Sequence, residues 1–232
     1  MKELILLPGL DVQQTLTINT TELKDKDILV IGEQTILTAR EFLKQEPKSL
    51  IIIVDNYEAL IQMRIKAPDL NIRMMEFENT DFRNESFDVV YAQASISSKN
   101  RNKIIKEIYK LLRDDGTFSL GEIITKGENV PVFINDIYER SDLLPLKEDE
   151  LSTYYTSKKF IIINEYELSY TLEEFYQKAR DLSTRSMKNA EKEELSYYKK
   201  LINKVNHESN AYLKQGGKRY MGFKMLLLKK EA

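Results

Sequence analysis

Several residue types that carry common chemistries are missing or nearly missing from this chain of 232 residues. It contains no cysteine, which excludes disulfides, thiolate metal ligands and thiol nucleophiles. It contains one histidine, His207, whose neighbours Asn206 and Glu208 are polar and indicate a solvated helix face. A single histidine cannot form a histidine cluster, so we expect no metal site.

Long hydrophobic runs are also missing. The first eleven residues, MKELILLPGLD, place only four apolar residues before Pro8, which is too short for a signal peptide or a membrane span. No later stretch approaches twenty apolar residues. A net charge of −2 gives no indication of general nucleic-acid binding. We therefore expect a cytoplasmic protein that binds neither membrane nor nucleic acid.

Short β-branched runs open the pattern of secondary structure. Residues 28–31 (ILVI) and 50–54 (LIIIV) are continuous and apolar, as in parallel strands that helices cover on both faces. Between them, Ala39, Phe42 and Leu43 recur at helical spacing. This order predicts a βαβ unit.

The alternation of helices and strands continues to about residue 124. The predicted elements are a helix over 57–66, strands over 71–77 and 87–91, a helix over 100–113 and a strand over 117–124. Strands that alternate with helices favour a parallel, doubly wound α/β sheet, and right-handed crossovers leave few topologies.

The rhythm changes after residue 125. The expected elements are a mixed stretch to about 146, a short helix in 147–157, a strand over 159–168, helices over 172–182 and 190–214, and a strand over 219–228. Thr171 and Glu174 fit a capping box that opens the first of the two long helices. Because no linker or repeat divides the chain, we predict one domain over 1–232 with a helical insertion over 170–216.

Three segments resemble the class I S-adenosylmethionine-dependent methyltransferases. They are DILVIGEQT (27–35), NESFDVVY (84–91) and EIYKLLRDDGTF (107–118). The resemblance implies a Rossmann-like α/β/α fold with a seven-stranded, mostly parallel sheet, whose last strand inserts antiparallel between the fifth and sixth. Within the family, the segments look most like ubiquinone/menaquinone and arsenite methyltransferases.

The resemblance also implies a cofactor loop, although this loop departs from the glycine-rich pattern. Gly32 matches the first glycine, whereas Gln34 and Ile36 stand where further glycines are usual and Val30 replaces a frequent acidic residue. Small residues suit the loop because the cofactor lies against bare backbone. The expected contacts to S-adenosylmethionine are Gly32, Glu33, Gln34 and Thr35.

Two pairs of residues lie at the ends of the second and third predicted strands. Asp55, with Asn56 beside it, is placed to accept hydrogen bonds from the ribose hydroxyls, or simply to start a turn at a strand end. Glu76 and Phe77 fall where the family binds adenine, the first as an acceptor and the second as a packing surface. An exposed glutamate at a strand end is the alternative for Glu76.

The ends of the fourth and fifth strands complete the predicted site. Gln93 is a candidate cofactor contact, and residues 95–98 are candidates to face the substrate, with an ordinary loop as the alternative. Glu122 either approaches a substrate or is a solvated strand end. No residue is assigned as a general base, because methyl transfer to a good nucleophile requires mainly positioning and exclusion of water.

The second long helix of the insertion carries a narrow apolar stripe. Its members are Leu195, Tyr198, Ile202, Val205 and Tyr212. Such a stripe suits a lid or a homodimer seam formed by the C-terminal helices.

These patterns support two hypotheses about function. The first is an S-adenosylmethionine-dependent methyltransferase that acts on a small molecule. The second is a catalytically inactive relative that serves as a binding or assembly partner, which the altered loop motivates. A nicotinamide-binding protein is disfavoured because the chain lacks G-x-G-x-x-G.

Overall fold

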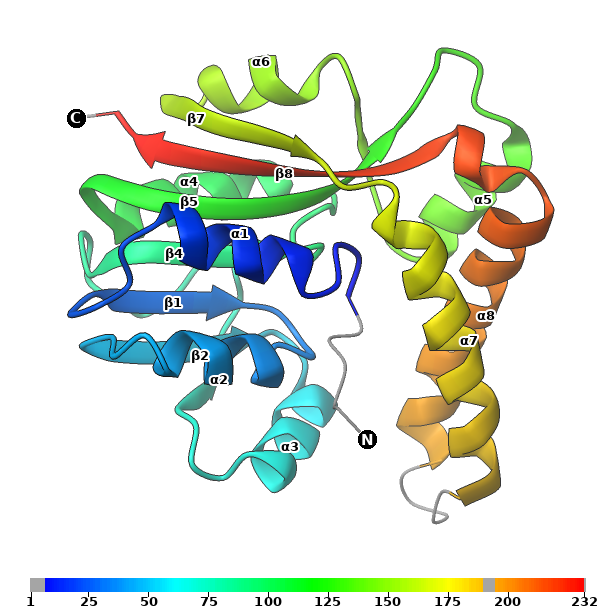
Figure 1. Cartoon of the computed structure of the whole chain (residues 1–232), viewed down its shortest axis with the longest axis horizontal. Coiled ribbons are helices and arrows are strands. Elements are labelled where there is room, and N and C mark those ends of the chain that lie inside the picture. The colour runs from blue at the N-terminus through cyan, green and yellow to red at the C-terminus, as the bar shows by residue number, and fades with distance from the viewer. Residues whose placement is uncertain (1–6, 190–194, 232) are drawn as a thin grey trace.

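A computed structural model describes residues 7–189 and 195–231 of the chain. Its centre is a twisted sheet with the strand order β3-β2-β1-β4-β5-β8-β7, and a short β6 pairs with β5 beside this path (Figure 1). The strands are β1 Asp27–Ile31, β2 Ser49–Val54, β3 Ile72–Met74, β4 Phe87–Gln93, β5 Leu112–Thr125, β6 Leu146–Lys147, β7 Phe160–Glu167 and β8 Met221–Lys230.

The pairing directions confirm the predicted topology. β1 to β5 are parallel to one another, while β8 runs antiparallel to both β5 and β7. The last strand is therefore inserted between the fifth strand and β7. The central strand β1 is mostly apolar because the sheet is covered on both faces, and all five of its residues are buried.

Helices cover both faces of the sheet and form three layers. They are α1 Val12–Thr20, α2 Ile36–Leu43, α3 Tyr57–Lys66, α4 Arg101–Leu111, α5 Val132–Arg140, α6 Leu151–Thr156, α7 Thr171–Asn189 and α8 Leu195–Lys214. Side chains of α2 and α3 share one core cluster with β1 and β2, whereas α4 and α6 pack with β4, β5 and β8 on the opposite face. Within the described part of the chain, no helix combines the length and the apolar character needed to cross a membrane.

Helix α1 was not predicted, because its buried face is polar. It buries Gln13, Gln14 and Thr17 instead of an apolar stripe. Gln13 donates from Nε2 to the carbonyl of Ala92 (3.1 Å), and the Thr17 hydroxyl bonds the Ser119 hydroxyl (2.7 Å). The helix is thus held on β4 and β5 by hydrogen bonds from the Gln13 amide nitrogen and the Thr17 hydroxyl.

Gly121 of β5 permits this close approach of α1 to the sheet. A Cβ atom at residue 121 would lie 2.0 Å from Gln13 Oε1 and 2.4 Å from the Phe223 ring, closer than any non-bonded atoms come. A side chain at this position would push α1 off the sheet.

The two long helices form a hairpin beside the carboxyl-end edge of the sheet (Figure 1). Helix α7 extends seven residues beyond its predicted end, and residues 190–194 at the predicted start of the second helix lie outside the described residues. The predicted capping box is wrong, because the Thr171 hydroxyl bonds groups outside the first turn of α7. The Thr171 hydroxyl accepts from the Gly9 backbone N–H (3.1 Å) and donates to the Leu168 carbonyl (2.6 Å).

The described end of the predicted apolar stripe packs inside the chain. Tyr212 is buried, and its ring lies 4.9 Å from that of Tyr176 on α7. Ala211 of α8 and Ala179 of α7 are buried in the same cluster. This end of α8 therefore packs against its own hairpin partner, and its buried side chains are not available to a second chain.

Candidate functional site

The loop after β1 has the backbone of a glycine-rich loop in spite of its altered sequence. Gly32 has φ +116°, and a Cβ atom there would lie 2.6 Å from Cβ of Ser95. Gln34 has φ +60°, in the left-handed region that glycine adopts without strain. Ile36 is the first residue of α2. The backbone therefore favours glycine at residues 32 and 34, whereas Ile36 belongs to the helix.

Two hydroxyl groups hold this loop in place. Ser95, from the segment after β4, donates to the Ile31 carbonyl (2.9 Å), and Thr35 donates to the Gly32 carbonyl (2.9 Å). Gly32 and Thr35 are buried, while Glu33 and Gln34 are half-buried. The two termini of the loop are fixed, and the residues between them remain in partial contact with solvent.

The ends of β2 and β3 bring further predicted residues to the same edge. Ile31 is level with Ile53 in the parallel register, so Gly32 and Asp55 follow neighbouring strands. Val54 is level with Met74, which places Glu76 beyond the end of the next strand. Because parallel strands end at one edge, these residues face a common region of the molecule.

Asp55 is exposed, and the pKa of its carboxyl is shifted. The loss of water on its protein side, followed by repulsion from Glu78, raises the pKa of the Asp55 carboxyl above its usual value. Asn56 caps α3, because its side-chain oxygen accepts from the N–H groups of Glu58 (2.8 Å) and Ala59 (3.2 Å). The Asp55 carboxylate thus lies at the surface, whereas the side-chain oxygen of Asn56 caps α3.

Glu76 and Phe77 have different environments. Glu76 is exposed and forms an isolated bridge with Asn79. Phe77 is only 5% exposed and belongs to the core cluster that includes Ile53 and Phe87. Glu76 therefore presents an acceptor at the edge, whereas most of the Phe77 ring is already packed against protein.

The structure places Gln93 in a structural role. Its side chain is 1% exposed and accepts from the Tyr91 hydroxyl (2.7 Å). Its amide nitrogen donates to the carbonyls of Pro8 and Leu10, both at 2.8 Å. These three bonds occupy the amide and anchor residues 8–10 across the end of β4. One feature of the sequence could have indicated this role. The carbonyl groups of the Pro8-Gly9-Leu10 turn need hydrogen-bond donors once the turn is buried.

Glu122 is neither a solvated strand end nor exposed to a substrate. Its side chain is 1% exposed and pairs with Arg101, whose Nε lies 2.9 Å from Glu122 Oε1. Ser97 (2.5 Å) and Tyr155 also donate to this carboxylate. Burial, reinforced by the negative charge of Glu122, raises the pKa of Tyr155 well above its usual value. The predicted approach to a substrate is therefore wrong, because protein groups surround the carboxylate.

Arg101 connects this buried carboxylate to a neighbouring loop. Its Nη2 donates to the Leu144 carbonyl (2.5 Å), and the Leu144 N–H donates to the Ser97 carbonyl (2.8 Å). Burial alone would lower the pKa of Arg101, but the charge of Glu122 raises it. The ion pair thus joins α4, β5, α6 and the loop before β6.

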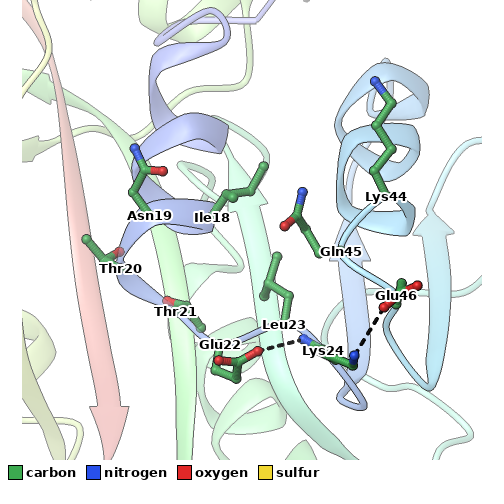
Figure 2. A pocket seen from close by; sticks show the side chains of 10 residues that line it. All are labelled: Ile18, Asn19, Thr20, Thr21, Glu22, Leu23, Lys24, Lys44, Gln45 and Glu46. Atoms are coloured by element: carbon green, nitrogen blue, oxygen red, sulfur yellow. Dashed lines mark hydrogen bonds and ion pairs between the residues drawn. The ribbon is translucent and has the colours of Figure 1, made fainter.

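One groove on the described surface is remote from the predicted site. The polar groove in Figure 2 has a volume of about 580 Å³ and is lined by Ile18, Asn19, Thr20, Thr21, Glu22, Leu23, Lys24, Lys44, Gln45 and Glu46. These residues end α1 and α2 and precede β1 and β2 (Figure 2). The groove therefore opens at the amino-end edge, opposite Gly32 and Asp55.

The second groove opens at the carboxyl-end edge. It has a volume of about 490 Å³ and is lined by Lys99, Thr125, Asn135, Tyr138, Glu139, Asp142, Leu143, Leu144 and Pro145. Thr125 is the last residue of β5, and Leu144 is held by Arg101. The groove therefore lies between α5 and the loop that the buried ion pair fixes.

Comparison with known proteins shows what part of the chain is similar to a methyltransferase. Residues 32–120 match the family model of the methyltransferase domain. The carboxy-S-adenosyl-L-methionine synthase of Nautilia profundicola is 31% identical over 125 residues, which cover 50% of this chain and 53% of that protein. The chain thus spans about half the length of this relative.

Solved structures show the same fold at low sequence identity. The phosphoethanolamine N-methyltransferase 2 of Haemonchus contortus, in complex with S-adenosyl-L-methionine, is similar with a TM-score of 0.75 and 13% identity over 97% of this chain and 54% of that one. The [4+2]-cyclase SpnF has a TM-score of 0.75 and 14% identity over 96% of this chain and 81% of that one. These structures and the strand order show a methyltransferase-like α/β fold, and residues 32–120 within it match the methyltransferase domain.

Proposed function

We propose that this protein is an S-adenosylmethionine-dependent methyltransferase that acts on a small-molecule acceptor. The observation that carries the proposal is the loop after β1. Residues 32 and 34 both have positive φ, and the Asp55 carboxylate lies exposed at the next strand end. Backbone N–H groups in such a loop and a carboxylate beside it suit the charged amino-acid part and the ribose of the cofactor.

Six of the predicted residues have a defined part in this proposal. The backbone of Gly32 to Thr35 holds the methionine and ribose portions, and Asp55 accepts from the ribose hydroxyls. Glu76 accepts from the adenine amine. When bound, S-adenosylmethionine supplies the activated methyl group. The residues of this chain bind and orient it and exclude water, which is what methyl transfer requires of a protein.

A small acceptor is supported by the size of the groove at the carboxyl-end edge. Its volume of about 490 Å³ falls within the range of small-molecule sites. Tyr138 and Leu143 contribute apolar surface, and Asn135 and Lys99 contribute polar groups. We therefore include a small-molecule methyl acceptor in the proposal.

The first experiment measures cofactor binding by calorimetry with S-adenosylhomocysteine. Changing Asp55 to Asn should weaken binding by roughly 10- to 100-fold, because a hydrogen bond to a charged acceptor contributes about 1.5–3 kcal/mol. Glu58→Gln is the matched control. Glu58 is an exposed acid three residues away, and the proposal assigns it no contact with the ligand. Equal affinity of the Asp55→Asn variant and the parent protein would contradict the role of this carboxylate.

The pH dependence of binding tests the same group. The pKa of free Asp55 is raised, and ribose donors favour its charged form. Affinity should therefore be constant at neutral pH and fall as pH decreases through this raised pKa, since protonation removes the charged acceptor. The Asp55→Asn variant should lack this step. A parent protein with a flat profile down to the acid unfolding transition would argue against the assignment.

The matched relative favours a second candidate, a reaction on S-adenosylmethionine itself. Its name describes the synthesis of a carboxylated form of the cofactor, and the identity extends over half of this chain. Mass spectrometry after incubation with S-adenosylmethionine and a cell extract separates the two candidates. Methyl transfer leaves S-adenosylhomocysteine, whereas the second reaction leaves a heavier derivative of the cofactor. Failure to bind the cofactor at all would favour the binding or assembly role.

A further inference from the structure

Strand β7 leaves one side of the sheet open. It is the last strand in the order and pairs only with β8 among the described residues (Figure 1). Its eight residues contrast with the three of β3 at the opposite edge. A very short edge strand resists pairing with other chains, but a long one presents a row of N–H and C=O groups to a partner.

The side chains of β7 are unusually apolar for an exposed edge. Ile161 is 50% exposed and Ile163 is 46% exposed. Both residues are β-branched, and such side chains pack well across paired strands. A partner strand would remove this apolar surface from water while it satisfied the outer backbone groups.

A β-bulge interrupts the pairing of β7 with β8 at Ile163. Ile162 is level with Leu228 and Asn164 with Leu227, so Ile163 is the extra residue. Bulges often protect an edge, usually together with a charge or a proline. Here the extra residue is itself apolar and half exposed.

The charges along β7 are complementary to those of the same strand in reverse. Lys158 and Lys159 precede the strand, and Glu165 and Glu167 lie at its end. Within the chain, Glu165 pairs with Lys224 (2.6 Å) and Glu167 with Lys126 (3.6 Å), so an ion pair with a second copy would share these acids. In an antiparallel pair of two β7 strands, the basic start of each copy lies opposite the acidic end of the other. The apolar centre, Ile161 to Ile163, then lies on or beside the two-fold axis.

We propose that β7 is a homodimer interface, in which a second copy of this chain adds its own β7 antiparallel and continues the sheet across a two-fold axis. The interface is isologous, as most dimer interfaces are. The main-chain ladder supplies hydrogen bonds, and the central isoleucines supply apolar burial. This inference does not depend on cofactor binding or on catalysis.

An exposed stripe on α3 is the competing surface. Tyr57, Ile61 and Ile65 lie four residues apart, and all three are exposed. A helix satisfies its own backbone groups, so this stripe offers apolar area without main-chain partners. The edge strand offers both apolar area and unpaired main-chain groups, and we therefore assign the interface to β7. The α3 stripe provides the internal comparison for the experiment.

The absence of cysteine makes a direct test straightforward. Single cysteines are introduced at Ile161, Ile162 and Ile163, at Ile65 on α3 and at the exposed Val132 on α5, and disulfide formation is followed by non-reducing electrophoresis. Only positions at a two-fold axis bring identical Cα atoms within disulfide distance. We expect Ile162→Cys or Ile163→Cys to cross-link at least tenfold faster than Val132→Cys. Fastest cross-linking at Ile65→Cys would overturn the proposal.

The parent protein is tested by sedimentation equilibrium over a concentration series. The expected mass is twice that of the 27.2-kDa chain at high concentration. Ile161→Lys should raise the dimer dissociation constant at least tenfold without loss of the folded state, because the side chain is half exposed; Val132→Lys should leave the constant unchanged. A monomer mass at all concentrations would refute the interface, as would a dimer that is indifferent to Ile161→Lys.

Discussion

At the scale of single residues, backbone conformation decides more than side-chain chemistry in the candidate site. Gln34 and Gly32 have positive φ, yet only one of them is glycine. A non-glycine residue in the left-handed region costs of order 1 kcal/mol, which the rest of the structure must offset. The loop therefore tolerates glutamine at 34 because its polar side chain remains half exposed.

Gly32 and Gly127 form a matched pair for mutation. Both have positive φ, but a Cβ atom at Gly32 would collide with Ser95, whereas one at Gly127 would meet nothing within 4 Å. Gly127→Ala should cost about 1 kcal/mol through backbone strain alone. Gly32→Ala should cost more, roughly 2–4 kcal/mol, since contact strain is added.

Chemical denaturation measures both glycine variants. We expect the free energy of unfolding to fall more for Gly32→Ala than for Gly127→Ala. We also expect Gly32→Ala to lose S-adenosylhomocysteine binding. Equal losses of stability in the two variants would show that the contact between the β1 loop and Ser95 is not tight.

At the scale of elements, a buried ion pair connects parts of the chain that sequence analysis treated separately. Arg101 opens α4, and Glu122 lies in β5, yet both contact groups from α6 or the loop before β6. Removing one partner of a buried pair leaves an uncompensated charge, which typically costs 3–5 kcal/mol.

Glu122→Gln should therefore destabilise the protein by about 3–5 kcal/mol, because Arg101 keeps its charge and loses its counter-ion. The double variant Arg101→Met/Glu122→Gln should recover part of this loss. Urea denaturation with an unchanged slope provides the measurement. A loss below about 1 kcal/mol for the single variant would mean that water reaches Arg101.

Helix α1 shows why elements with polar interiors escape prediction. The sequence pattern indicated a helix at α2 and placed the ends of α3 and α4 within two residues, because side chains of these helices pack on the sheet. The buried face of α1 consists of Gln13, Gln14 and Thr17. Gln13 and Thr17 bond strand groups far along the chain. No local pattern in the sequence indicates such partners.

At the scale of the whole molecule, ligand binding should stabilise the fold as a unit. The predicted cofactor contacts come from three neighbouring strand ends, and residues 8–10 tie the edge of β4 to the start of α7. A ligand that binds only the folded chain stabilises it by about 4 kcal/mol at a thousandfold excess over its Kd.

Thermal unfolding with S-adenosylhomocysteine measures this effect. For a chain of this length the shift should be roughly 10 °C, since each kcal/mol moves the Tm by about 2–4 °C. Adenosine at its solubility limit serves as a weaker comparison. A single transition that does not move at any concentration would contradict cofactor binding and would leave the dimer interface at β7 unaffected.

The sequence by itself determined the alternation of strands and helices from β1 to β5, because continuous β-branched runs and helical spacing are local consequences of burial in a parallel sheet. It also placed Gly32, Asp55 and Glu76 at strand ends. Only the tertiary structure decided which polar groups satisfy one another. Gln93 binds the N-terminal turn and Glu122 binds Arg101, since buried hydrogen-bonding groups take the partners that folding brings to them, wherever these lie in the chain.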